Sequence, residues 1–193
     1  MDYESFYNEA ASLYQQETLS FEAWLKQMAQ VAHQHKFKFT ELVEVVYSIT
    51  GVRISTDEWF TVVLANDAPG TDRFPVQVGV HLEECGELLT EFSTGDEELD
   101  TKLLLARSLL EEIGTVLKSG RAHVKILNRK AFFDAVLDQR VTGEGVAYLA
   151  GFNLKEGVAR VDVANFTKFV DGKPLYKEGG KIAKGPNFWN PEF

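Results

Sequence analysis

The chain has 193 residues, 45% of them hydrophobic and 25% charged, which is the composition of a folded globular protein and excludes a disordered or low-complexity one. Its net charge of −9 repels a phosphate backbone, so we expect no nucleic acid partner. A single cysteine, no apolar run long enough to span a bilayer and an N-terminus without a signal-peptide pattern predict a cytoplasmic protein with no membrane partner.

Residues 1–60 are predicted to be helical. Ser20 is a typical N-cap residue directly before the amphipathic run FEAWLKQMAQVAHQ, and the apolar segment TELVEVVYSI follows it. The segment ANDAPGTDRFP carries Pro69, Gly70 and Pro75, which favour a connection over a regular element. We therefore expect an N-terminal helical extension at 1–56, joined to the rest of the chain by this segment.

The middle of the chain, from residue 76 to residue 173, contains no proline and has room for several long helices. Asn128 and Asn153 are predicted N-caps, and Asn153 is followed by an acidic residue three positions later. Apolar residues at spacings of three and four predict helices near 75–93, 97–119, 129–150 and 154–169. The fold class expected from this pattern is all-α, a helical bundle.

From Asn165 the composition changes. The final 29 residues hold five lysines against three acids, together with four glycines and three prolines. This pattern indicates an irregular, basic tail on an otherwise acidic protein. Lysines set among glycines are well suited to neutralising phosphate groups, although such a segment is also typical of a flexible terminus.

Four glutamates, Glu83, Glu84, Glu87 and Glu91, fall on one arc of the first middle helix. The opposite side carries an apolar seam, which consists of Val78, Leu82, Cys85, Leu89 and Phe92. Taken alone, an acidic face of this kind is typical of a solvated surface helix. The seam is predicted to pack against other helices.

Asp134 and Asp138 lie one turn apart on the helix at 129–150. They share their stripe with Val141, Gly145 and Leu149, so we expect the stripe to be buried. No Lys or Arg follows either aspartate at the third or fourth position, and buried carboxylates need a compensating charge. Hard carboxylate oxygens from two helices predict a Mg²⁺ site, with Mn²⁺ as the other suitable ion.

Four segments resemble the MazG-like superfamily of all-α nucleoside triphosphate pyrophosphohydrolases, to which the phosphoribosyl-ATP pyrophosphohydrolase-like proteins also belong. They are HLEECGELLTEF, similar to its E-E-x-x-E helix; DAVLDQRVTGEGVAYLAGFNL, similar to its second acidic helix; NFTKF, similar to its asparagine-x-x-lysine phosphate motif; and VDGKPLYKEGGKIAKGPNFWNPEF. The last segment resembles the ending of a phage-encoded branch.

The resemblance covers residues 57–193, including a C-terminal tail at 170–193. It implies a helical bundle that assembles as a homodimer or homotetramer. The implied activity is Mg²⁺-dependent hydrolysis of a (deoxy)nucleoside triphosphate to the monophosphate and pyrophosphate, in nucleotide-pool control or house-cleaning. The oligomer is also expected from the apolar faces of the middle helices, with the acidic site near the subunit interface.

The resemblance also implies roles for single residues. The metal ligands expected are Glu84, Glu87, Asp134 and Asp138, and the catalytic set is Glu83, Glu84, Glu87 and Asp138. Glu83 is the candidate to orient or deprotonate the attacking water. Phosphate oxygens are expected to contact Asn165, Lys168, Lys181 and Lys184, while Phe188 or Trp189 either stacks on the base or packs the terminus.

Two features depart from the superfamily pattern. A glutamate is expected three residues before the second-helix aspartate, but Ala135 precedes Asp138 and Ala131 precedes Asp134 at that spacing. An alternative alignment uses EEIGTVL at 111–117, which places Thr115 where the aspartate belongs. The departures support a rival interpretation, a non-catalytic helical interaction protein that keeps the bundle without turnover.

Overall fold

The structure is a computed structural model that describes residues 1–67, 72–177 and 180–193. Within these ranges the regular structure consists of eight α-helices and no strand. The all-α prediction is therefore confirmed. Pro69 and Gly70 of the predicted connection lie outside the described residues. The chain forms two compact units, one from residues 1–67, 129–175 and 183–193, and one from the described parts of 68–128 with 176–182.

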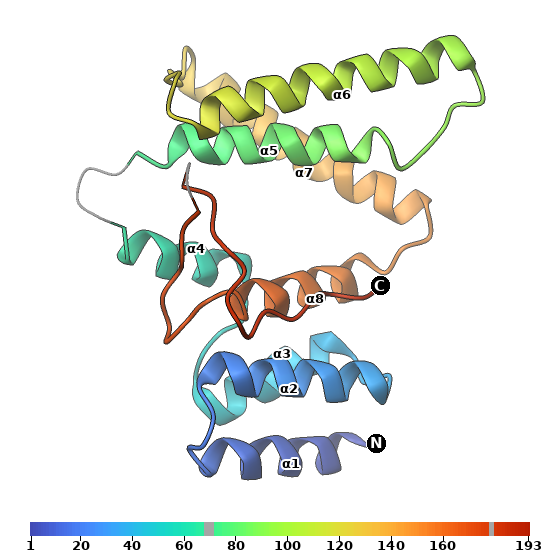
Figure 1. The fold of residues 1–193 in the computed structure, drawn as a ribbon. Helices are drawn as coiled ribbons and strands as arrows, with labels where there is room; N and C mark the ends of the chain where they lie inside the picture. The colour runs from blue at the N-terminus through green and yellow to red at the C-terminus, as the bar shows by residue number, and fades with distance from the viewer. Residues whose placement is uncertain (68–71, 178–179) are drawn as a thin grey trace. The chain divides into compact units, whose positions relative to one another are not determined.

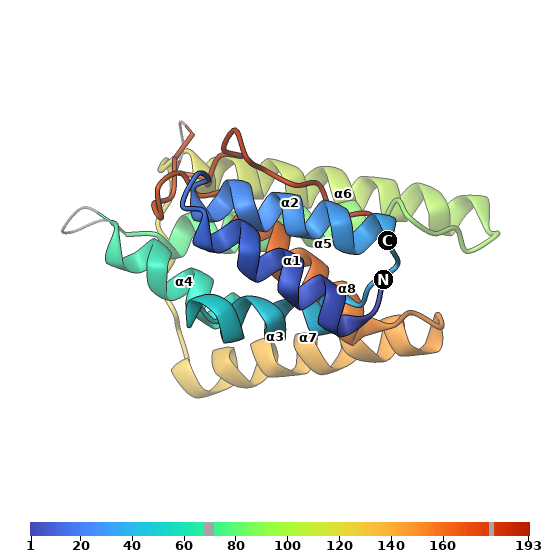
Figure 2. The ribbon, with the colours of Figure 1, turned by 90° about the horizontal axis from the view of Figure 1, so that it is seen from below.

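The first unit contains six helices. In Figure 1, α1 forms an outer layer, α2 and α3 form the next, and α8 lies on their other side; Figure 2 shows the same layers from below, with α1 in front. Residues 1–56 therefore pack with α8, and the boundary at 56 stays a prediction drawn from the resemblance. The helices are α1 (Tyr3–Gln15), α2 (Phe21–Gln34), α3 (Phe39–Thr50), α4 (Thr56–Ala65), α7 (Arg129–Leu149) and α8 (Leu154–Phe166).

Aromatic side chains dominate the core of this unit. Phe6 stacks on Phe37 with ring centroids 4.4 Å apart, and Phe39 stacks on Trp189 at 4.9 Å. Trp24 is also fully buried, and its indole N–H donates to a backbone carbonyl of α1. Because large aromatic rings bury the most apolar area per residue, these contacts hold the N-terminal helices and the end of the tail in one core.

The predicted N-caps Ser20 and Asn153 are confirmed, since their side chains accept from backbone N–H groups of α2 and α8. Glu156 has a different role from the one its spacing suggests. Its carboxylate accepts from the backbone N–H groups of Phe39 at 2.8 Å and Thr40 at 3.2 Å. These are the first N–H groups of α3, whose own N-cap residue makes no side-chain cap, so α8 caps α3 across the core.

The second unit is a helical hairpin of α5 (Phe74–Leu88) and α6 (Glu97–Lys118), which lie side by side in Figure 1. The helices approach most closely at two glycines: a Cβ on Gly79 would lie 2.7 Å from the carbonyl oxygen of Gly114. The side of α5 that faces α6 therefore contains Gly79 and Gly86, both buried.

The predicted apolar seam of the first acidic helix is only partly covered within the chain. Val78, Leu82, Cys85 and Leu89 are only partly buried in the chain, and Phe92 is exposed. The helices α5 and α6 approach closely because glycine has no side chain, and hydrophobic periodicity does not detect a contact of this kind. The helix also ends at Leu88, before the predicted residue 93, because Ser93 and Thr94 fold back to hydrogen-bond Asp100 of α6.

We predict that Gly79→Ala destabilises the protein by about 1–3 kcal/mol, because the added methyl group meets a backbone carbonyl that cannot move without separating α5 from α6. Thermal unfolding and amide hydrogen exchange of α5 and α6 measure the effect. Gly143→Ala is the matched control: nothing lies within 4 Å of its Cβ position on α7, so it is expected to stabilise by up to about 1 kcal/mol. Equal stability of both variants would contradict the tight glycine contact.

Candidate functional site

Among the predicted site residues, Glu83 forms two ion pairs with lysines. One carboxylate oxygen lies 2.8 Å from Lys118 Nζ of α6, and the other lies 2.9 Å from Lys181 Nζ of the tail. All three residues belong to the second unit. The hydrogen bond from Lys118, reinforced by Lys181, holds the pKa of Glu83 below its usual value although partial burial opposes this. Glu83 is therefore a neutralised carboxylate with both oxygens occupied.

Glu84 and Glu87 are the free carboxylates of α5. Both are exposed, and among the described residues neither carboxylate receives a hydrogen bond or an ion pair. They stand three positions apart, so they lie on neighbouring turns of one helix face. Two unpaired carboxylates at this spacing offer hard oxygen ligands to a divalent cation.

Asp134 and Asp138 are exposed on α7, and α7 buries none of its residues within the chain. The predicted burial of their stripe is therefore wrong for the single chain: Val141 and Leu149 are exposed beside them. Hydrophobic periodicity identified this stripe of α7, but it could not show whether another segment of the chain packs on it. In the described part of the chain no hydrogen bond or ion pair engages either carboxylate, which leaves this pair as available as the pair on α5.

The two carboxylate pairs belong to different compact units, Glu84 and Glu87 to the second and Asp134 and Asp138 to the first. Across residues 1–67, 72–177 and 180–193, no three His, Cys, Asp or Glu side chains stand close enough to hold a metal ion. Each pair taken alone supplies two ligands of the type that Mg²⁺ prefers.

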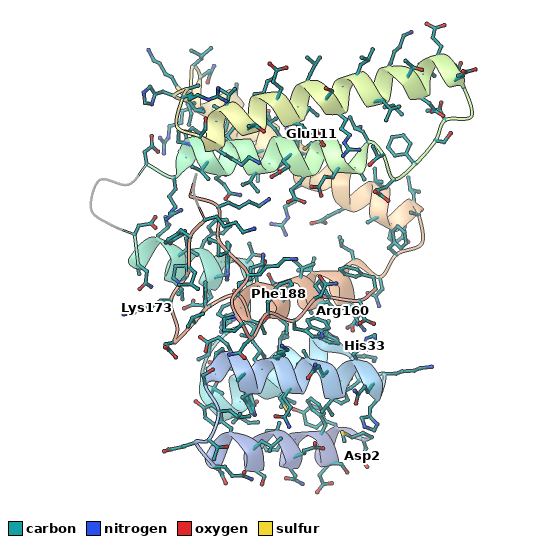
Figure 3. The ribbon with its side chains drawn as sticks, in the orientation of Figure 1. Asp2, His33, Glu111, Arg160, Lys173 and Phe188 are labelled. Carbon is teal, nitrogen blue, oxygen red and sulfur yellow. The ribbon has the colours of Figure 1, made fainter. Side chains whose placement is uncertain are left out.

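The alternative acidic motif at 111–117 lies on α6, the helix that packs against α5. Glu111, labelled in Figure 3, is bound by Arg107 Nε at 2.7 Å, while Glu112 is exposed. Gly114 of this motif makes the close contact with Gly79. Helix packing therefore explains the glycine of this motif, and no bound ligand is needed to explain it.

The asparagine-x-x-lysine motif lies at the end of α8 in the first unit. Asn165 Oδ1 accepts from Lys168 Nζ at 2.7 Å, and the Asn165 carbonyl accepts from the indole N–H of Trp59 at 3.1 Å. Lys168 Nζ lies about 6 Å from the ring centres of Trp59 and Phe188. The predicted Asn165 and Lys168 are thus brought together, in a setting of two aromatic rings.

The tail adds Lys184 to this group, with its Nζ 4.4 Å from the ring centre of Phe188, which lies along α8 in Figure 3. Of Phe188 and Trp189, it is Trp189 that packs the terminus: it is buried against Phe39, and its backbone N–H donates to the buried hydroxyl of Thr167. Phe188 stays half-buried and is the ring available to a ligand. Removing the tail after residue 170 would therefore damage the core as well as the site.

Lys118 was missed by sequence reasoning. It ends an amphipathic helix, where a basic residue is expected for its interaction with the helix dipole, so nothing in the sequence distinguished it. The one relevant feature of the sequence is the pair Gly79 and Gly114. These glycines bring α6 close enough to α5 for Lys118 to reach Glu83.

The chain matches no protein-family model, no curated protein and no solved structure. The resemblance to the pyrophosphohydrolase superfamily therefore depends on its four segments alone. None of the helices in the described ranges has both the length and the apolar character needed to cross a bilayer.

Asp162 is buried on α8, one turn before Asn165. Burial raises the pKa of its carboxyl group above the usual 3.8, opposed by a 2.7 Å hydrogen bond from the Thr56 hydroxyl and assisted by the negative charge of Asp57. A raised pKa means that the folded state holds the proton more tightly than the unfolded state. The carboxylate therefore lowers stability as the pH rises through the native pKa, and the penalty persists at neutral pH.

We predict that Asp162→Asn stabilises the protein at pH 7 by about 0.5–1 kcal/mol, since the amide oxygen still accepts from Thr56 without a buried charge. The gain is expected to vanish below pH 3.8, where the carboxyl group is protonated in both states. Thermal unfolding across this pH range measures it. Glu9→Gln, at an exposed position of α1, is the control. A gain that does not depend on pH would contradict the burial effect.

Proposed function

We propose that the protein hydrolyses a (deoxy)nucleoside triphosphate to the monophosphate and pyrophosphate, with Mg²⁺ or Mn²⁺ as cofactor, in nucleotide-pool control or house-cleaning. One observation carries the proposal: Glu84 with Glu87, and Asp134 with Asp138, form two exposed carboxylate pairs that no cation of the described residues neutralises. By contrast, the carboxylates of Glu22, Glu83 and Glu156 each accept from donors of distant segments. Unpaired carboxylates at one-turn spacing supply oxygen ligands of the kind that hold Mg²⁺ in metal-dependent phosphohydrolases.

The residues fit the metal in donor chemistry. Glu84, Glu87, Asp134 and Asp138 would hold it, and when bound it would polarise the phosphoryl group under attack and stabilise the leaving pyrophosphate. Each pair supplies two carboxylate ligands, and the acidic site is proposed to lie near the subunit interface of the oligomer.

The chain's own groups would do the rest. Lys168, Lys181 and Lys184 supply ammonium donors for phosphate oxygens, and the amide of Asn165 positions Lys168. Phe188 offers an aromatic face for a base, beside the two lysines of the first unit. Glu83 is suited to orienting water rather than to taking its proton, because both of its carboxylate oxygens already accept from lysines.

A homodimer or homotetramer is part of the proposal, because two long helices leave apolar side chains uncovered. On α6 the side away from the glycine contact carries Leu105, Leu109 and Ile113, all at least 48% exposed. On α7 eight large apolar side chains are exposed, including Phe133 and Leu149. Exposed apolar faces usually mark an interface, and isologous contact with a second copy would cover them.

The rival function is a non-catalytic helical interaction protein. Ala131 and Ala135 favour it, since each replaces the glutamate that the superfamily places three residues before an aspartate. The same exposed apolar faces would then serve a different protein. Catalysis is preferred because carboxylate pairs on two helices and a basic tail are the chemical groups that hydrolysis of a nucleoside triphosphate uses.

We predict that Glu87→Gln or Asp138→Asn reduces kcat/KM for nucleotide hydrolysis by about 100-fold or more, because each removes one charged metal ligand. Pyrophosphate release from a panel of nucleoside triphosphates with Mg²⁺ measures activity, and Mn²⁺ titration followed by electron paramagnetic resonance measures metal affinity without turnover. Glu91→Gln, at an exposed glutamate beyond the end of α5, is the control. A wild-type protein that binds no Mn²⁺ and releases no pyrophosphate would favour the rival function.

We also predict that the protein has at least twice its chain mass of 21.7 kDa in solution. Leu109→Glu is expected to shift it to the monomer, because a charge in the centre of a buried apolar face costs several kcal/mol. Light scattering over a range of concentrations measures the mass. Leu19→Glu, at an exposed residue outside the apolar faces of α6 and α7, is the control. A fully active monomer at all concentrations would contradict this part of the proposal.

A further inference from the structure

We propose that Lys118 and Lys181 together form a binding site for the pyrophosphate portion of a nucleotide or for pyrophosphate itself, and that Glu83 is the internal counter-ion with which this anion competes. The choice of ligand rests on the proposed function. Lys118 receives no role from the sequence, and Glu83 gains a role beyond that of the water-orienting carboxylate: it positions two lysines. The site lies entirely within the second unit.

The glycine contact between α5 and α6 creates the path by which Lys118 reaches Glu83. Lys118 Cγ lies only 3.0 Å from the position that a Cβ on Gly79 would take, so the lysine stem crosses α5 over a residue without a side chain. Its ammonium group then meets Glu83, one turn further along α5, at 2.8 Å. Any larger residue at position 79 would close this path.

The tail brings Lys181 from the other side. Two pairings hold its described part: Lys177 N–H donates to the Lys181 carbonyl, and Tyr176 forms an antiparallel bridge with Ile182. Arg73, at the start of α5, anchors these residues by donating to the Gly180 carbonyl at 2.8 Å and by stacking 3.8 Å above the Tyr176 ring. Lys181 is thus held in place by backbone contacts rather than by Glu83 alone.

The donors and charges of this cluster leave capacity for an anion. An ammonium group has three N–H donors, and Lys118 and Lys181 each direct one of them at Glu83. Two lysines against one carboxylate give the cluster a net charge of +1 on a protein of −9. The Lys181 side chain is 43% exposed, whereas Lys118 and Glu83 are 18% and 24% exposed, so an anion can approach from the Lys181 side into a partly desolvated setting.

The alternative is a purely structural cluster that ties the tail to the hairpin. The two differ in one measurable respect, the sign of the effect of Glu83 on anion affinity. A counter-ion competes with the anion for the ammonium groups, so its removal strengthens anion binding. A purely structural carboxylate only organises the lysines, so its removal leaves anion binding unchanged or weaker.

The test is isothermal titration of the full chain with inorganic pyrophosphate in EDTA, so that neither metal nor turnover contributes. Lys118→Met and Lys181→Met are each expected to weaken binding about 10-fold, the loss of one charge-assisted hydrogen bond. Lys102→Met is the matched control, because Lys102 lies on the same helix and pairs with Glu98. Glu83→Gln is expected to tighten binding several-fold. Circular dichroism checks that each variant is folded, and Lys118→Arg keeps the charge if Lys118→Met does not fold.

Pyrophosphate affinities of the two lysine variants equal to that of Lys102→Met would overturn the site. An affinity of Glu83→Gln equal to or weaker than wild type would overturn the counter-ion assignment. The test of the anion site is separable from the test of hydrolysis. If the wild-type protein and its variants bind pyrophosphate as expected but the wild type releases none from any nucleotide, the anion site stands and the proposed enzymatic activity is wrong. If the wild-type protein hydrolyses nucleotides but the lysine variants bind pyrophosphate as well as wild type does, the proposed activity stands and the proposed anion site is wrong.

Discussion

A carboxylate that leaves water needs donors, and this requirement determines how the segments of the chain are joined. Glu83 is met by two lysines, one of them from the tail. Glu156 is met by the first N–H groups of α3. Glu22, fully buried on α2, accepts from the backbone N–H of Gly172 at 2.7 Å, which fixes the turn of the D-G-K-P segment. The contacts of Glu83 with Lys181, of Glu156 with Phe39 and of Glu22 with Gly172 join residues 98 to 150 positions apart in the sequence.

The carboxylates without donors are equally informative. Glu84, Glu87, Asp134 and Asp138 remain in water on exposed helix faces, where an ionised group costs nothing. Had they been partly buried without partners, the chain would have had to protonate or pair them, as the raised pKa of Asp162 illustrates. The division between paired and unpaired acids therefore separates the groups that hold the fold together from those available to a cation.

The C-terminal tail at 170–193 both packs in the core and carries lysines that can bind phosphate. Trp189 belongs to the core, stacked on Phe39, while Lys181 and Lys184 lie on the same short segment and face a carboxylate and an aromatic ring. A buried anchor on an irregular segment reduces the entropy that its lysines lose when they bind a phosphate group. Basic composition and structural anchoring are thus two properties of one segment, and only the first is visible in the residue counts.

The sequence by itself determined the all-α class, the four middle helices to within a few residues, and the caps at Ser20 and Asn153, because periodicity and capping depend on neighbours three or four positions away. It also placed the acidic pairs on their helices. Tertiary structure alone decided that Glu83 is bound by lysines, that α5 packs through Gly79, and that α7 buries nothing within the chain. These features depend on contacts between distant segments, which local spacing does not encode, and on the absence of a side chain, which a hydrophobic pattern does not register.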